Sequence, residues 1–81
     1  MEEIIAKLYN KVVYIESQEM LEEARGIIEG KGFEGSDFFY LSDDIKDNYL
    51  FLDYGDEKFG ISVKMEYDEE ITFEEFKTIM Q

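Results

Sequence analysis

The segment KVVYIE at residues 11–16 indicates a strand in the interior of a β-sheet. Its residues are mostly β-branched or aromatic, which favours a strand. Apolar side chains fall on both faces, with Val12 and Tyr14 on one face and Val13 and Ile15 on the other. Because a strand at a sheet edge or on a wet surface would alternate between apolar and polar residues, this pattern predicts a strand covered on both sides. We therefore place it at the centre of the sheet.

The best-defined helix follows directly, from Gln18 to Gly30. Its apolar residues recur at helical spacing and form one stripe. The stripe comprises Met20, Leu21, Ala24, Ile27 and Ile28. Ser17 is a favourable N-cap, and Gly32 offers a C-terminal stop together with Gly30. Gly26 lies inside the helix, where glycine is unfavourable, and this predicts close packing of the helix against the sheet.

Helices are also predicted near both ends of the sequence. Acidic residues precede an apolar repeat at residues 4–9, as suits a helix N-terminus. Thr72 and Glu75 have the spacing of a capping box, and Ile71 and Phe76 stand where a hydrophobic staple would pack. The last helix should therefore begin directly after Thr72.

The middle of the sequence is typical of strands. YLFLDY at residues 49–54 leads through a Gly-Asp turn at 55–56 into residues 58–67, where apolar and polar residues alternate. FFYL at residues 38–41 is either a further strand or an irregular segment. The predicted order is α-β-α-β-β-β-α, in one α+β domain spanning residues 1–81. We expect a three- to four-stranded, mostly antiparallel sheet with about three helices packed on one face.

Missing residue types exclude much of enzymology. The chain has no cysteine and no histidine, so it lacks a thiol nucleophile, the usual general base and the commonest metal ligand. With 21 acidic residues among 81, close carboxylate pairs arise by chance. A chain this short also has little material for the cleft that carboxylate catalysis needs. We expect a protein that is not an enzyme and that uses no cofactor.

Two further classes of site are disfavoured. The acidic clusters at residues 43–47 and 66–70 could attract Ca²⁺ weakly, but a loop starting at Asp43 puts Ile45 where an EF-hand needs Asp or Asn, so we expect no dedicated metal site. No apolar stretch approaches the roughly 18 residues of a membrane span, and the first residues, MEEIIAKLYNK, lack a basic leader. We expect a soluble, cytoplasmic protein that makes no contact with a membrane.

Acidic residues dominate the charge and point to a basic partner. The formal net charge is -13, and the excess is concentrated in the second half. Residues 43–75 carry twelve acidic residues and three lysines, whereas residues 1–42 carry nine acidic residues and four basic ones. Self-repulsion of this size lowers folding stability, which favours a role for the charge in binding a positively charged partner. Direct binding of nucleic acid is disfavoured, because phosphates would be repelled.

The candidate partner-binding residues are acids and tyrosines around the predicted hairpin and before the last helix. They are Asp43, Asp44, Asp47, Tyr49, Asp53, Tyr54, Asp56, Glu57, Glu66, Tyr67, Asp68, Glu69 and Glu70. In one interpretation these charges only solvate loops and the tyrosines belong to the core. In the other, the carboxylates stand where phosphates would lie in the basic groove of a nucleic-acid-binding protein. A third alternative is a small interaction or regulatory domain, monomeric or dimeric, whose charge serves solubility.

Small size, strong acidity and the absence of cysteine resemble the short proteins that phages and mobile elements encode against host defences. This group includes anti-CRISPR proteins and DNA mimics. Two segments resemble pieces that are common in uncharacterised phage proteins: EEARGIIEGKGF at residues 22–33 and ITFEEFKTIM at residues 71–80. The resemblance implies an inhibitor that binds a nuclease or effector complex stoichiometrically, without catalysis. It implies no particular binding residues, since members of this group share none.

Overall fold

The structure is a computed structural model that describes residues 2–34, 40–53 and 55–81. In chain order, its elements are α1 (Glu2–Lys7), β1 (Lys11–Tyr14), α2 (Gln18–Gly30), the 3-10 helix η1 (Ile45–Asp47), β2 (Tyr49–Asp53), β3 (Lys58–Ser62), β4 (Glu69–Ile71) and α3 (Phe73–Met80). Helices and strands follow the predicted order, and the α+β class is confirmed. The predicted site residue Tyr54 and two residues of the FFYL segment, Phe38 and Phe39, lie outside the described residues.

The four strands form one mixed sheet in the order β3-β2-β1-β4. β2 pairs antiparallel with both β1 and β3, while β4 pairs parallel with β1. Val12 lies opposite Phe51 on one side and Glu70 on the other, and Phe51 lies opposite Gly60. β1 is therefore an interior strand, as predicted, and the sheet is mostly antiparallel. The prediction that β1 is covered on both sides is wrong, because Tyr14, on the face opposite the core residue Val13, is only half-buried.

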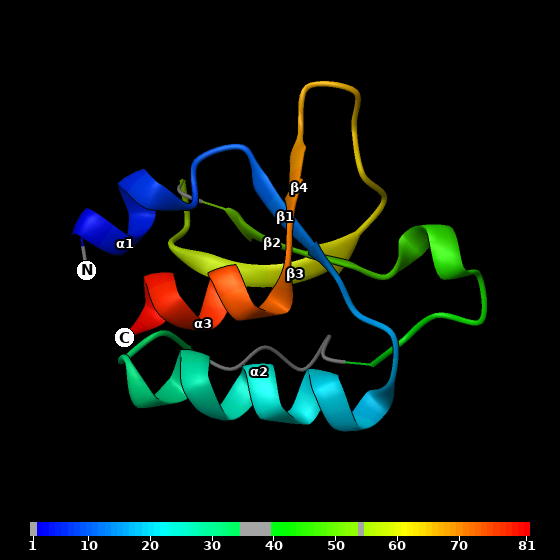
Figure 1. Cartoon of the computed structure of the whole chain (residues 1–81), viewed down its shortest axis with the longest axis horizontal. Helices are drawn as coiled ribbons and strands as arrows, with labels where there is room; N and C mark the ends of the chain where they lie inside the picture. Colours follow the sequence, from blue (N-terminus) through cyan, green and yellow to red (C-terminus); the bar gives the residue numbers. More distant parts are fainter. Residues whose placement is uncertain (1, 35–39, 54) are drawn as a thin grey trace.

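The hydrophobic core lies between one face of this sheet and the helices. Figure 1 shows α2 and α3 on the same side of the sheet. Core residues alternate along the strands, so that one face of each strand is buried against the helices. The strands contribute Val13, Leu50, Leu52, Phe59 and Ile71 to this cluster, and the helices contribute Leu21, Ala24, Ile28, Phe76 and Met80. Ile4 and Ile5 of α1 pack against the same cluster.

One predicted strand is too long, and one strand was not predicted. The alternation over residues 58–67 predicted a single strand, but β3 ends at Ser62, and Val63, Met65 and Tyr67 are exposed. Residues 63–68 instead form a loop that leads to β4, where the chain pairs parallel with β1 (Figure 1). The described end of the FFYL segment, Tyr40 and Leu41, lies in no strand.

The ends of α2 follow the predicted signals. The Ser17 hydroxyl accepts a hydrogen bond from the Met20 N–H at 3.2 Å. After the helix, Gly32 adopts φ 91° and donates to the Glu29 carbonyl, and the Phe33 N–H donates to the carbonyl of Ile28. This pair of bonds is a Schellman motif. The prediction for Gly26 is wrong, because Gly26 is exposed and a Cβ there would meet nothing within 4 Å.

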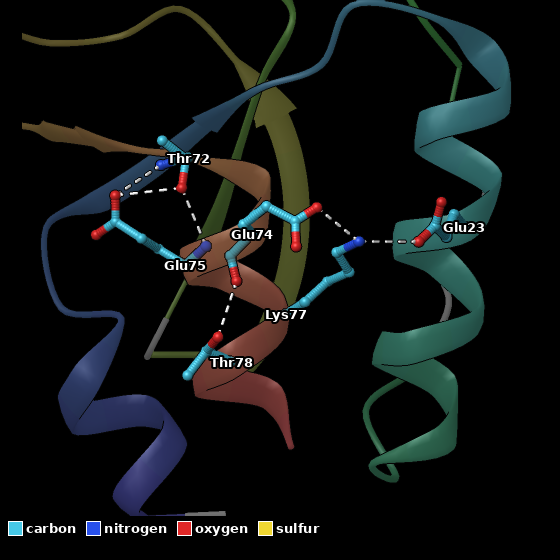
Figure 2. A network of polar contacts seen from close by, with 6 residues as sticks. All are labelled: Glu23, Thr72, Glu74, Glu75, Lys77 and Thr78. Carbon is cyan, nitrogen blue, oxygen red and sulfur yellow. Dashed lines mark hydrogen bonds and ion pairs between the residues drawn. The ribbon is translucent and has the colours of Figure 1, made fainter.

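The capping box of α3 is present as predicted. The Thr72 hydroxyl accepts from the Glu75 N–H at 3.0 Å, and the Glu75 carboxylate accepts from the Thr72 N–H at 3.3 Å (Figure 2). Farther along α3, Lys77 contacts Glu74 at 2.9 Å and Glu23 of α2 at 3.6 Å. The hydrogen bond to Glu74 and the charge of both carboxylates raise the pKa of Lys77 above its ordinary value of 10.5. Lys77 thus links α3 to α2 at the surface.

Alanine substitutions at Gly26 and Gly32 should have opposite effects on stability. Gly26→Ala should raise the free energy of unfolding by about 0.5–1 kcal/mol, because it removes backbone freedom from the unfolded chain and meets no steric obstacle. Gly32→Ala should lower it by about 1 kcal/mol or more, because φ 91° is unfavourable for a residue with a Cβ. Urea unfolding followed by circular dichroism measures both. A change of the same sign in the two variants would contradict this account.

Candidate protein-binding surfaces

The predicted partner-binding residues that the structure describes fall into three groups. The first lies at η1 and comprises Asp43, Asp44 and Asp47. The second lies at the end of β2 and in the β2–β3 turn and comprises Asp53, Asp56 and Glu57. The third lies in the loop of residues 63–68 and on β4 and comprises Glu66, Tyr67, Asp68, Glu69 and Glu70. Tyr49 stands apart from these groups, at the start of β2.

Asn48 fixes the loop that carries the first group. Its side chain is buried, accepts from the Ser42 N–H at 2.8 Å and donates to the Ser42 carbonyl at 3.1 Å. The Asn48 carbonyl also accepts from the Ile15 N–H at 2.9 Å, which ties the loop to β1. Within the loop, the Asp44 carboxylate caps η1 by accepting from the Lys46 N–H. Asn48 was not predicted, because no local sequence pattern marks a bond across six residues.

The second group sits on a tight turn. The Asp53 carboxylate accepts from the Gly55 N–H at 2.9 Å and from the Asp56 N–H at 3.4 Å, which shapes the turn. Glu57 closes it with φ 55°, a left-handed conformation that is uncommon for residues other than glycine. Both Asp56 and Glu57 are exposed. The turn therefore presents their carboxylates to solvent from a defined backbone.

The third group combines an exposed loop with an edge strand. The Asp68 carboxylate accepts from the Met65 N–H at 2.9 Å, and Tyr67 is 71% exposed. Glu69 forms an ion pair with Lys11, its neighbour on β1. Glu70 lies opposite Val12 and is exposed. This group mixes local turn contacts with carboxylates that face solvent.

The sheet register brings two of the three groups to one end of the sheet. Glu69 pairs with Lys11 at the start of β1, and β2 runs antiparallel to β1, so the turn after Asp53 lies at that same end. η1 precedes Tyr49, which pairs with Tyr14 at the other end of β1. Figure 1 shows η1 on the far side of the sheet from the β2–β3 turn. The predicted residues therefore do not form one continuous patch.

Lysine and arginine side chains form ion pairs mainly with acidic residues on or next to the helices. They pair less with the predicted partner-binding carboxylates. Arg25 pairs with Glu29, and Lys77 pairs with Glu23 and Glu74. Lys58 pairs with Glu34, which follows α2. Among the ten predicted carboxylates, Glu69 alone has an ion pair within residues 2–34, 40–53 and 55–81. The negative charge at the ends of the sheet is thus largely unpaired within the described part of the chain.

A second candidate surface lies on the sheet face opposite the helices, and of its residues only Tyr49 was predicted from the sequence as a site residue. Tyr14, Tyr49 and Phe51 project from the sheet face opposite the helices and are half-buried around Val12, which is 2% exposed. We call these four residues the aromatic face. The rings of Tyr14 and Tyr49 are 5.3 Å apart, and the Phe51 ring lies over Gly60, about 3.1 Å from where a Cβ would stand. Cross-strand contacts therefore hold the aromatic face in place.

Beside the aromatic face the surface is hollowed. A shallow open depression of about 420 Å³ lies between Tyr14 of β1, the edge strand β4 and the first residues of α2 and α3. Its lining comprises Tyr14, Glu16, Met20, Glu70, Ile71, Thr72 and Phe73. It includes two exposed carboxylates, those of Glu16 and Glu70, and no lysine or arginine among the described residues.

No protein-family model, curated protein or solved structure matches the chain. Within the described part of the chain, no helix has the length and apolar content that a membrane span requires. The same residues contain no group of three or more acidic side chains placed to hold a metal ion. Function must therefore be inferred from the surfaces described above.

Asn48→Ala should lower the free energy of unfolding by about 1–3 kcal/mol, because the N–H and carbonyl of Ser42 lose their partner in a partly buried site. Ser42→Ala is the control, since among the described residues the Ser42 hydroxyl accepts a hydrogen bond only from the exposed Asp44 N–H, and its loss should change little. Urea unfolding gives both values. Equal losses in the two variants would contradict this account, because the two Asn48 hydrogen bonds would then contribute no more than the one exposed bond of the Ser42 hydroxyl.

Thermal stability should rise with ionic strength. The molecule measures 32 × 26 × 24 Å, so at about 0.01 M salt, where the Debye length is about 30 Å, most of its carboxylates repel one another. At about 1 M salt the Debye length is about 3 Å, and this repulsion is screened. Differential scanning calorimetry measures the midpoint of thermal unfolding in NaCl and in KCl. An equal rise in both salts indicates an effect of ionic strength, whereas a difference between them indicates binding of one cation. A midpoint that falls with salt would mean that the ion pairs of the chain outweigh its repulsion.

Proposed function

We propose that this protein is a non-catalytic acidic inhibitor that acts in the cytoplasm by binding a nucleic-acid-binding protein of the nuclease or CRISPR-effector type. Its carboxylates would occupy a lysine- and arginine-lined groove in place of phosphates. The observation that carries this proposal is that nine of the ten predicted carboxylates form no ion pair with a lysine or arginine among the described residues. They remain available to the basic groups of a partner.

Rigid presentation supports the same proposal. Asp53 and Asp44 each accept a hydrogen bond from nearby backbone, and Asn48 ties the η1 loop to Ser42. Carboxylates held in this way lose little conformational freedom on binding, which removes part of the cost of association. A net charge of -13 would also steer a basic partner toward the protein and speed association at low salt.

A second candidate is favoured by the aromatic face. Tyrosine rings on the sheet face opposite the helices suit a small interaction or regulatory domain, monomeric or homodimeric, whose charge serves solubility. Salt separates the two candidates, because binding through carboxylates weakens steeply as ionic strength rises, whereas apolar binding does not.

Charge reversal at the β2–β3 turn tests the proposed inhibitor. The immobilised chain is exposed to bacterial lysate at about 50 mM salt, captured proteins are eluted by a salt gradient or by DNA and RNA, and they are identified by mass spectrometry. The double variant Asp56→Lys, Glu57→Lys should reduce capture of any nucleic-acid-displaceable protein by about tenfold or more. Lysine at position 57 adds no new backbone strain, since Glu57 already has φ 55°.

The matched control carries the same change of charge on α2, as Glu19→Lys with Glu22→Lys. Both residues are exposed and belong to none of the predicted groups. Capture by this control should stay within about threefold of the wild type, because only long-range attraction is reduced. Circular dichroism of both variants checks that each one folds. A captured partner that resists salt and ignores nucleic acid would contradict the inhibitor proposal and favour the second candidate.

A further inference from the structure

We propose that the aromatic face and the adjoining depression form the docking surface for an arginine-bearing segment of a basic protein partner. An arginine side chain would sit in the depression, with its guanidinium between Glu16 and Glu70 and against the ring of Tyr14. This inference rests on the proposed function, because it takes the partner to be basic. It adds the surface that is contacted and the side chain that is recognised.

The aromatic face is open because the helices occupy the other side of the sheet. Ile4 and Ile5 of α1 and the apolar stripes of α2 and α3 pack in the single core cluster, which contains Val13 but not Val12. Tyr14 and Tyr49 are left half-buried with their rings in contact. Neither tyrosine hydroxyl has a hydrogen-bond partner among the described residues, so the apolar ring and its polar tip are both available. Tyrosines of this kind are enriched at the centres of protein interfaces.

The depression combines shape, aromatic surface and negative charge. Glu70 lies on the same face of the sheet as Val12 and Tyr14, and Glu16 follows the end of β1. Neither carboxylate has an ion pair within the described parts of the chain. Phe73 also contributes to the lining, but the ammonium group of Lys77 lies over its ring at 5.0 Å, so Tyr14 is the ring assigned to the guanidinium. The surroundings therefore favour a cation.

Charge complementarity selects the occupant. A second copy of the chain would bring another net charge of -13, and its own Glu16 and Glu70, to this surface, so repulsion opposes a homodimer here. A nucleic acid would be repelled for the same reason. A basic protein segment gains both from the carboxylates and from burial of the tyrosine rings.

Arginine fits this surface better than lysine. Its planar guanidinium stacks on aromatic rings and donates hydrogen bonds to carboxylates in a fork geometry, whereas the lysine ammonium is a strongly hydrated point charge. A site that pairs a ring with carboxylates uses both properties of the guanidinium.

The test is a titration of the isotope-labelled full chain with a peptide of alternating arginine and glycine, followed by NMR. The matched peptide carries citrulline in place of arginine, which keeps the shape and removes the charge. The arginine peptide should shift the signals of Val12, Tyr14 and Glu70, and the citrulline peptide should not. Glu16→Gln with Glu70→Gln should weaken the affinity by about tenfold or more. Glu2→Gln with Glu3→Gln, which removes the same charge from two exposed residues of α1, should stay within about threefold.

Tyr14→Leu separates stacking from charge, because it removes the ring and keeps all carboxylates. Its affinity for the arginine peptide should fall severalfold. Equal losses of affinity in the two double variants, signals that shift only at the β2–β3 turn or η1, or no binding of the arginine peptide would overturn the docking surface. Sedimentation that shows a dimer through the aromatic face would overturn it as well. None of these outcomes affects displacement of a captured protein by nucleic acid, which tests the proposed function separately.

Discussion

The ring of Phe59 joins the edge strand β3 to the helical layer. It packs edge-to-face on Phe33 at 5.2 Å and on Phe76 at 6.2 Å. Phe33 follows the Schellman turn of α2, and Phe76 is the most buried ring of α3, so this row of rings sets the position of both helices relative to the sheet. Loss of a buried phenylalanine ring costs about 3–5 kcal/mol, whereas a domain of this kind has only about 5–15 kcal/mol of stability in total.

A single core on one side of the sheet determines how the other side is built. The helices in the described part of the chain pack on one face of the four-stranded sheet. The second face is therefore left without a helical layer and must be compatible with contact with water. The chain has Tyr14 and Tyr49 there, both half-buried, and places Phe51 over Gly60, where its ring covers backbone. The acidic residues around the face counteract association of one copy with another.

Local signals in the sequence predicted the elements that depend on near neighbours. The Ser17 cap, the capping box at Thr72 and Glu75, and the hairpin through Gly55 are all set by residues a few positions apart. The strand β4 could not be predicted in this way, because its sequence, EEI, gains its conformation from parallel pairing with β1, 58 residues away in the register of Lys11 and Glu69.

The prediction that the strand continues over residues 63–67 failed for a related reason. A strand needs a partner, and β2 begins at Tyr49, which pairs with Ser62. The residues before Tyr49 belong to the η1 loop, which Asn48 holds in another conformation, so nothing remains for Val63 and its successors to pair with. Periodicity identifies side chains that could share a face, but only the register shows where that face ends.

The same distinction applies to the acidic residues. Sequence alone identified their abundance, while the structure shows that Asp44, Asp53 and Asp68 also shape turns by accepting backbone N–H groups. Shaping a turn does not prevent these aspartates from binding a partner. Each carboxylate has two oxygens, and its hydrogen bonds to backbone N–H groups use one of them. The second oxygen has no partner among the described residues. A turn-forming aspartate is thus a carboxylate whose position is fixed before a partner arrives, which is the property that a substitute for a phosphate requires.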